Sequence, residues 1–394
     1  MTAERKRQPH GRRVKCSGGY WAYVPEPLPP RIQWTAEVVS ALSAADRAVG
    51  RLAGEGRRLP NPHLLIRPFV RREAVLSSRI EGTQATLGEL LAAEAGAVVE
   101  RSPADLREVG NYVVALEYGV ERMRTLPLSL RLVRELHERL MRGVRGDAAK
   151  PGEFRRSQNW IGRPGSTLSN AAFVPAPPDR LKGCLGAWEQ FLHDDTLPPL
   201  VQAALAHSQF EAIHPFLDGN GRVGRLLITL LLIARGVLPS PLLYLSAWFE
   251  ATRDEYYARL SGVTDRGEWE EWLGYFLAGA AGQAEDALGR IQRIDELLRR
   301  WRGQLAKTPS GRPEKAIGLF AENPYWTVNR LAARLSVAFT TAQRAIDRLE
   351  SAGIVALAGP AKRNRVYCAR AILEVLEEPP RLYSSRPRRR GRRE

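Results

Sequence analysis

Residues 214–225, HPFLDGNGRVGR, gather several groups that could act on a phosphate. The stretch contains an imidazole at His214, a carboxylate suited to Mg²⁺ at Asp218, and guanidinium groups at Arg222 and Arg225. Glycines between them let backbone amides approach an anion closely, and a helix that opens behind such a loop favours anions at its N-terminus. Together these groups supply the parts needed for phosphoryl or nucleotidyl transfer.

Each of these features has an ordinary structural explanation when taken alone. An isolated histidine is usually structural, a DGNG segment is usually a turn, and two arginines three residues apart usually lie on a solvated face. Their combination within residues 214–225 favours the chemical interpretation. His207, seven residues or about two helical turns before His214, has no companion ligands and is interpreted as a core histidine.

The elements that must position this stretch are predicted to be helices. Apolar residues recur at three- and four-residue spacing through most of residues 35–300, whereas strand-like alternation is scarce. A helix over residues 199–213 must end at His214, because the residue before a proline is pushed out of the α region. The next helix is expected to open at Arg222, which would place both arginines on one side of it.

The stretch 214–225 matches the HxFx(D/E)GNGRxxR signature of the Fic-domain family without departure, and the chain resembles that family. The resemblance implies protein AMPylation, in which AMP passes from ATP to a Ser, Thr or Tyr hydroxyl of a target protein. It implies that His214 is the general base, that Asp218 holds Mg²⁺, and that Phe216 is a buried anchor of the loop. The implied ATP-binding residues are Gly219, Asn220, Gly221, Arg222 and Arg225, the last on the γ-phosphate.

Residues 68–82 have the features of a helix, with a proline in the first turn and Gly82 as the C-terminal stop. Ser77 and Glu81 lie four residues apart and therefore share a face. The sequence SSRIEG resembles the (S/T)xxxE(G/N) inhibitory motif of Fic proteins whose inhibitory helix precedes the Fic core. This resemblance implies that Ser77, Glu81 and Gly82 are inhibitory and that Glu81 blocks the γ-phosphate site at Arg225.

Residues 152–178 are predicted to form a hairpin, because two short extended stretches flank a turn at residues 163–166. The segment resembles the Fic flap, which covers the nucleotide and offers an edge strand to the target. A surface hairpin without function is the alternative.

The pattern changes after a Pro/Gly/Ser-rich segment at residues 308–313. Helices are expected at 314–321, 328–335 and 340–352, followed by a basic β-hairpin with strands at 354–357 and 366–368. This order resembles a winged helix-turn-helix, whose third helix would be the recognition helix, although such modules also dock proteins. The predicted DNA contacts are Thr341, Arg344, Arg348, Lys362 and Arg363.

The composition is typical of a folded protein of two or three domains: 394 residues, 44% hydrophobic, 26% charged, net charge +16. The three cysteines, Cys16, Cys184 and Cys368, lie too far apart for a CxxC ligand set and suggest no disulfide framework, which favours a cytoplasmic location. The longest apolar run, residues 226–234, is too short to cross a bilayer, so no membrane partner is expected. The basic N-terminus is not followed by the hydrophobic segment of a secretory signal.

Basic residues are concentrated at both ends of the chain. Residues 1–15 hold six Lys/Arg against one Glu, and residues 381–394 hold seven Arg against one Glu. Blocks of like charge repel themselves, so both ends are predicted to be arms. Attraction to phosphate-bearing or other acidic partners and a purely solvated role remain equally open. The predicted division is 1–15 basic disordered arm, 16–125 N-terminal helical region with the inhibitory helix, 126–300 Fic catalytic domain, 301–312 linker, 313–375 winged helix-turn-helix and 376–394 Arg-rich tail.

The sequence therefore predicts a mainly α protein, with a helical Fic core, a small β-hairpin flap and a C-terminal winged helix-turn-helix. The predicted function is that of an autoinhibited protein adenylyltransferase that uses ATP and Mg²⁺ on a target protein. Two alternatives stay open: a DNA-binding regulator whose Fic domain senses nucleotide, and a Fic enzyme that also removes AMP. DNA would be a further partner of the C-terminal module, and a homodimer is compatible with the resemblance.

Overall fold

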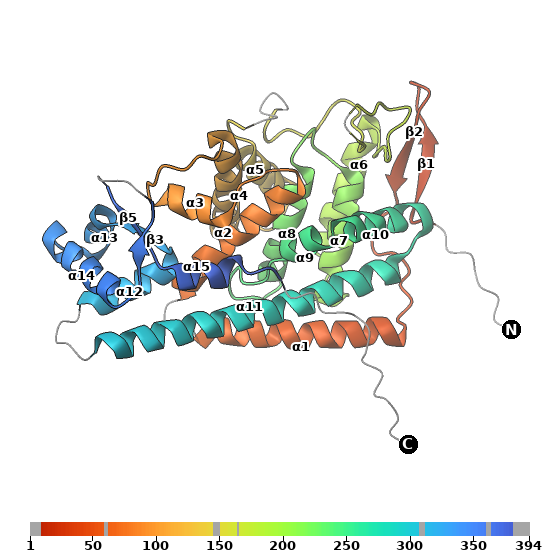
Figure 1. The fold of residues 1–394 in the computed structure, drawn as a ribbon. Coiled ribbons are helices and arrows are strands. Elements are labelled where there is room, and N and C mark those ends of the chain that lie inside the picture. The colour runs from red at the N-terminus through yellow and green to blue at the C-terminus, as the bar shows by residue number, and fades with distance from the viewer. Residues whose placement is uncertain are drawn as a thin grey trace, which may run out of the picture.

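The computed structural model describes residues 9–58, 62–144, 150–163, 165–306, 312–359 and 364–380. Helices dominate this part of the chain (Figure 1), which confirms the predicted mainly α class. No helix among the described residues is both long and apolar enough to span a membrane. The helices are α1 (Ala36–Arg58), α2 (Pro62–Ile80), α3 (Leu87–Glu94), α4 (Pro103–Arg122), α5 (Leu130–Leu140), α6 (Pro178–Leu192), α7 (Pro199–Ile213), α8 (Asn220–Ala234), α9 (Ser246–Ala251), α10 (Arg253–Arg266), α11 (Trp269–Leu305), α12 (Arg312–Glu322), α13 (Val328–Leu335), α14 (Phe339–Ser351) and α15 (Arg370–Glu377).

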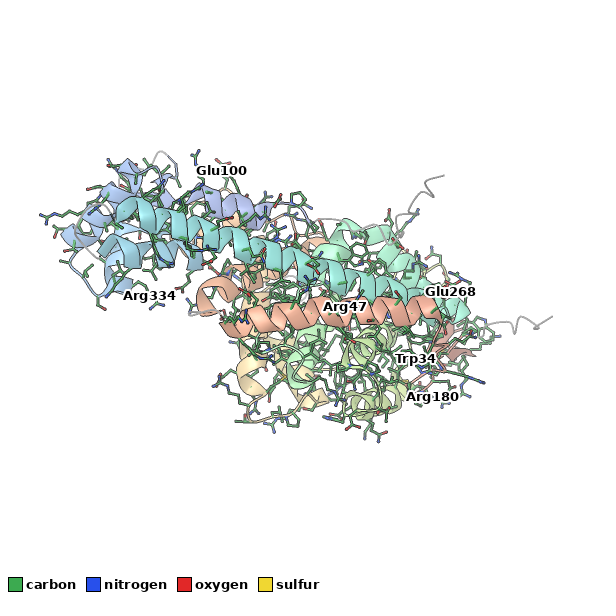
Figure 2. The ribbon with its side chains drawn as sticks, turned by 90° about the horizontal axis from the view of Figure 1, so that it is seen from below. Trp34, Arg47, Glu100, Arg180, Glu268 and Arg334 are labelled. Carbon is green, nitrogen blue, oxygen red and sulfur yellow. The ribbon has the colours of Figure 1, made fainter. Side chains whose placement is uncertain are left out.

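Two long helices, α1 and α11, lie side by side and form a base for the others (Figure 2). Above them, α7 is the central helix: every residue from Leu200 to Ile213 is buried except Glu211. A helix that is apolar on all sides is stable only inside a core. The helix α8 packs against α7 and is buried almost as completely. The loop between these two core helices, residues 214–219, is therefore held at both ends.

The N-terminal segment differs from the predicted arm, because residues 11–15 form a strand. β1 (Gly11–Lys15) pairs antiparallel with β2 (Trp21–Pro25). On β2, Ala22 and Tyr23 are buried, and this burial holds the hairpin in place although the lysine and arginines of β1 remain exposed. Like charge on solvent-facing positions does not oppose pairing when the partner strand buries apolar side chains. Residues 1–8 lie outside the described residues.

The predicted linker at 301–312 is also corrected, since α11 continues to Leu305. Ile294, Leu298, Trp301 and Leu305 recur at three- and four-residue spacing and are all buried, so one apolar face extends the helix into the C-terminal part. Residues 307–311 lie outside the described residues.

The C-terminal module, residues 312–380, shows the predicted order of helices with a three-stranded antiparallel sheet. The strands β3 (Tyr325–Thr327), β4 (Ala356–Leu357) and β5 (Val366–Cys368) have the order β3–β5–β4. The Thr327 side chain caps α13 by accepting the Arg330 N–H at 3.3 Å. Neither β3 nor α15 was predicted, and α15 crosses the predicted boundary at residue 375. The module lies at the opposite end of the molecule from β1 and β2 (Figure 1).

Arg290 of α11 attaches the end of α15 to the base. Its side chain is fully buried and forms two bonds to Asp286, of 2.7 and 3.1 Å. It also donates to the carbonyl oxygens of Val375 and Leu376 and, at 2.7 Å, to that of Glu378. Carbonyl groups at a helix C-terminus lack intrahelical partners and favour cations. One arginine therefore neutralises a buried carboxylate and caps a helix.

The substitution Arg290→Met should destabilise the protein by about 3–5 kcal/mol, because it leaves Asp286 buried without its closest cation. The matched control on the same helix is Arg299→Met, which breaks an exposed pair with Asp295 and should cost less than about 1 kcal/mol. Urea unfolding followed by circular dichroism measures both. Equal losses in the two variants would contradict the assignment.

Candidate active site

His214 lies directly after α7 in the left-handed conformation, with φ 49°. Its N–H still caps α7 by donating to the carbonyl of Phe210 at 2.9 Å. The ring Nδ1 lies 3.2 Å from the carbonyl oxygen of Glu211, which assigns the proton to Nδ1 and leaves Nε2 as an acceptor. Partial burial of the ring lowers the pKa of His214 to about 4. The imidazole is therefore neutral at pH 7 and able to accept a proton at Nε2.

The loop after His214 is closed by the side chain of Asn220. Its Oδ1 accepts the N–H of Phe216 at 2.8 Å, and its Nδ2 donates to the Phe216 carbonyl at 2.9 Å. Phe216 is fully buried, in agreement with its predicted anchoring position. Because both ends of the amide are engaged by the loop backbone, the Asn220 side chain acts here as a clamp rather than as a group free for a phosphate.

His137 of α5 supports the same loop, a role that the sequence did not predict. Its ring stacks on Phe216 at 3.7 Å, Nε2 lies 3.0 Å from the carbonyl oxygen of Asp218, and Nδ1 accepts the Gly152 N–H at 2.8 Å. Acceptance at Nδ1 places the proton on Nε2, which donates to Asp218. Nothing in the local sequence around His137 signals this role.

Arg155 and Asn159 brace the backbone of the histidine from the other side. The Nε of Arg155 donates to the His214 carbonyl at 2.9 Å, and Asn159 Nδ2 donates to the Phe216 carbonyl at 2.8 Å. Burial lowers the pKa of Arg155 to about 10, so the guanidinium remains charged at neutral pH. Both residues belong to the segment predicted as a flap, and their positioning role was not predicted.

The anion cradle is the N-terminus of α8, which begins at Asn220 rather than at the predicted Arg222. Gly219 caps it with φ 77°, a conformation that suits glycine. Asp218 accepts the Gly219 N–H at 2.6 Å, and its side chain is 49% exposed. Among the described residues no three ligands gather as a metal site. One accessible carboxylate fits Mg²⁺, which is commonly held by one or two carboxylates together with substrate phosphates.

Arg225 is buried on α8 and is held by the end of α2. Its Nε donates to Ser77 Oγ at 2.9 Å, and its Nη2 donates to the Ser77 carbonyl at 3.0 Å and to Glu81 Oε1 at 2.7 Å. Burial works to raise the pKa of Glu81, but the Arg225 guanidinium outweighs it and the pKa lies below its usual range. A Cβ atom at Gly221 would overlap with the Glu81 carboxylate, so the carboxylate lies directly over the start of α8.

Arg222 has a different partner from the one expected. Its guanidinium pairs with Glu108 of α4 and lies 3.5 Å from Asp218. The predicted clamp of Arg222 and Arg225 on one side of a ligand is therefore not assembled, because each arginine is paired with a carboxylate from a different helix.

The helix that carries Ser77 is longer than predicted, since α2 begins at Pro62 and Pro68 lies inside it. Glu81 and Gly82 follow its last turn, and Gly82 has φ 101°, as a C-terminal stop requires. Glu73, one turn before Ser77, was missed. It is buried and accepts from the N–H and hydroxyl of Ser246 and from Tyr112, which fixes α2 against α9.

The predicted flap hairpin is reduced to a single antiparallel bridge between Ile161 and Phe173. The segment between them contains a turn stabilised by Asn170, which accepts the Thr167 N–H at 2.6 Å. Its conformation is therefore fixed by local side-chain bonds instead of a strand ladder. Pro164 lies outside the described residues.

The three predicted DNA contacts on α14 differ in exposure and in their partners. Arg344 is exposed and Thr341 is half-buried. Arg348 donates to the carbonyl of Leu305 at 3.4 Å and so lies toward the end of α11. Lys362 and Arg363 lie outside the described residues.

His207 is confirmed as a core histidine. It is buried, its Nε2 lies 2.8 Å from the Tyr256 hydroxyl, and burial lowers its pKa to about 3. Its ring also stacks beside Phe249, with ring centroids 5.8 Å apart.

Residues 39–121 match the Fic/DOC family N-terminal region, and residues 127–232 match the Fic/DOC family. Similar curated proteins include the protein adenylyltransferases Fic of Drosophila yakuba and Drosophila virilis. The former is 33% identical over 166 residues, which cover 41% of this chain and 31% of that protein. The latter is 35% identical over 147 residues, covering 36% of this chain and 28% of that protein. The chain thus spans about a third of the length of these relatives.

Two solved structures resemble the fold. A Fic family protein from Desulfovibrio desulfuricans G20 has a TM-score of 0.58 at 21% identity, over 87% of this chain and 98% of that one. Fic-1 from C. elegans, residues 134–508, has a TM-score of 0.52 at 25% identity, over 65% of this chain and 74% of that one. The helical core described above is thus the Fic fold.

NMR titration should find His214 neutral from pH 8 down to about pH 5.5 with its proton on Nδ1, since its pKa is lowered to about 4. A His214→Ala variant assigns the ring signals. Because the folded-state pKa lies below the ordinary value of about 6.5, protonation appears only as the pH falls toward 4. A midpoint near 6.5, or a proton on Nε2, would contradict the geometry.

Proposed function

Since the chain carries the N-terminal and Fic domains of the Fic/DOC family, we propose that it is a protein adenylyltransferase that moves AMP from ATP to a target protein. The observation that carries the proposal is the acceptor Nε2 of His214 beside the anion-binding start of α8. The name of the curated relatives, protein adenylyltransferase, supports the same reaction.

The proposed step is an in-line transfer at the α-phosphorus of ATP. The hydroxyl oxygen of a Ser, Thr or Tyr of the target bonds to that phosphorus, the bond to the pyrophosphate oxygen breaks, and the proton passes to Nε2 of His214. The amides of Asn220 and Gly221 bind phosphate oxygens, and the Gly219 amide joins them once Asp218 releases it. Mg²⁺ held by Asp218 would neutralise charge on the phosphates.

Glu81 makes this enzyme self-inhibited. Its carboxylate already occupies Arg225, and a charge-assisted pair of 2.7 Å with a buried arginine is strong. The γ-phosphate of ATP carries the same kind of oxygen and competes for the same guanidinium. Active turnover then requires α2 to move far enough to release Arg225, and Gly82 beyond the helix end permits such movement.

The substitution Glu81→Gly should raise auto-AMPylation by about ten-fold or more, because each 1.4 kcal/mol removed from the blocking pair changes the productive population about ten-fold. The measurement is labelling from α-labelled ATP with Mg²⁺. Adding His214→Ala should lower the labelling rate of the Glu81→Gly variant by about 10²- to 10⁴-fold, the usual contribution of a general base.

The matched control is Glu100→Gly, an exposed glutamate in the loop between α3 and α4 (Figure 2), which should leave labelling unchanged. If neither Glu81→Gly nor the wild type labels itself or a cell lysate, the result would contradict the transferase proposal. It would favour the alternative, a regulator whose Fic domain only senses nucleotide. Removal of AMP from modified targets is a second alternative, tested with the labelled product.

The C-terminal module is the proposed sensor that controls the inhibitory helix. We assign it to the winged helix-turn-helix class on its element order, with Arg344 on α14 facing solvent for a DNA or protein ligand. The module contacts the region that holds α2: Arg67 of α2 pairs with Glu322, and the Gly88 N–H donates to Glu377 at 2.9 Å. Arg67 lies in the second turn of α2 and Glu81 directly follows its last residue, so a ligand that shifts the module would displace Glu81 through this helix.

Reversing one charge at this contact should weaken inhibition with Glu81 still present. Arg67→Glu or Glu322→Arg should each raise auto-AMPylation, and the double swap should bring labelling back toward the wild-type level, incompletely because Glu322 also pairs with Arg334. In the Glu81→Gly background the same substitutions should add nothing, since the block is already gone. The control Arg124→Glu breaks an exposed pair with Glu121 elsewhere and should change nothing. Unaltered labelling in both single variants would refute the coupling.

A further inference from the structure

Glu211, in the last turn of α7, carries a buried carboxylate oxygen that lacks a partner. Its Oε1 is enclosed and has no hydrogen-bond partner among the described residues. Leaving a polar atom buried and unpaired costs free energy, so such an atom in a folded protein calls for an explanation. The reaction proposed above gives this carboxylate no part.

The Glu211 carboxylate lies against the same face of α8 as that of Glu81, about one helical turn further along. A Cβ atom at Gly221 would overlap with the Glu81 carboxylate and would lie 2.9 Å from Arg225 Nη1. A Cβ atom at Gly224 would overlap with Glu211 Oε1. Positions three residues apart on a helix lie about 5–6 Å from each other. The two carboxylates are therefore neighbours along α8, with the Arg225 guanidinium beside them.

The charged neighbours of Glu211 are Arg225 and Glu81. Burial raises the pKa of Glu211 to about 7, while Arg225 works to lower it and Glu81 to raise it further. The other titratable groups around it are kept neutral at pH 7 chiefly by burial: Tyr256 and Tyr257 of α10, with His207 and His214. The charge state of Glu211 is therefore set by how Arg225 is paired.

Arg225 needs another anion as soon as Glu81 withdraws. Its bonds from Nε and Nη2 go to Ser77 and Glu81, which lie at the end of α2 or directly after it. Movement of α2 would remove both partners at once, and a buried guanidinium without a counter-charge is costly. Glu211 belongs to α7, whose other residues from Leu200 to Ile213 are all buried in the core, so its carboxylate would stay beside α8.

We propose that Glu211 is a positioning residue that becomes the carboxylate partner of Arg225 when Glu81 withdraws. On forming this pair it releases its proton to solvent, and it holds the guanidinium in place until the γ-phosphate of ATP displaces it. The proposal rests on the proposed release of Arg225 by Glu81 and adds the group that lowers the cost of that release. A carboxylic acid with a purely structural role at the end of α7 would not respond in this way to the loss of Glu81.

Titration of Glu211 in the full chain, with and without Glu81, tests this directly. In the wild type the ¹³C carboxyl signal of Glu211, assigned with Glu211→Gln, should titrate near pH 7. In the Glu81→Gly variant its midpoint should fall to about 5 or below, because pairing with a guanidinium lowers the pKa of a carboxyl by about 1–3 units and the repulsion from Glu81 is gone. A midpoint that stays above about 6 would overturn the proposal.

Urea unfolding at pH 8 is the second measurement. At this pH, above its raised pKa, Glu211 is ionised without a bonded partner, so Glu211→Gln alone should leave the urea midpoint unchanged or raise it. In the Glu81→Gly background the same substitution removes the remaining anion beside Arg225. It should then raise the unfolding equilibrium constant about ten- to a hundred-fold.

The matched control for the unfolding measurement is Glu255→Gln, which breaks an exposed pair with Arg259 and should have the same small effect in both backgrounds. If Glu211→Gln also has equal effects with and without Glu81, its role is purely structural and the proposal is refuted.

Neither measurement involves ATP or AMP transfer, so this proposal and the proposed reaction can fail separately. Auto-AMPylation by the Glu81→Gly variant without a change in the titration of Glu211 would retain the transferase and reject the role of Glu211. A lowered midpoint in a variant that transfers no AMP would retain that role and reject the transferase.

Discussion

The buried guanidinium of Arg225 imposes a constraint on the structure around it. A charge removed from water must be paired, and here Ser77 and Glu81 supply all of its partners on the α2 side. In the absence of another anion, this requirement draws the end of α2 onto the start of α8. A phosphate would meet the same requirement, so under the proposed mechanism Glu81 and a nucleotide compete for one guanidinium.

The end of α2 pairs with Arg225, so the other contacts of α2 help to set where Glu81 lies. Glu73 fixes the middle of the helix to Ser246 of α9, and Arg67 fixes the beginning to Glu322 of the C-terminal module. Glu81 thus follows a helix that is bonded both to α9 and to the C-terminal module, which is the contact on which the proposed coupling depends.

His214, the proposed base, is held by a different set of interactions. His214 adopts a left-handed conformation, and its carbonyl is bonded by Arg155 and Asn159. His137 and Asn220 hold the following loop through Phe216 and Asp218. These contacts involve no residue of α2, so the proposed release of Arg225 by α2 would leave the histidine and its loop in place.

Features that depend on short-range geometry could be predicted from local sequence. The proline after His214 ends α7, the glycines allow the turn before α8, and Thr327 begins α13, because each acts on backbone angles or donors within a few residues. The contacts between distant groups became visible only in the folded chain. Arg290 reaches Glu378, Arg222 turns to Glu108, and His137 supports Phe216 across separations that local patterns do not encode. These pairings follow from where packed helices place buried charges, and that placement depends on the whole core.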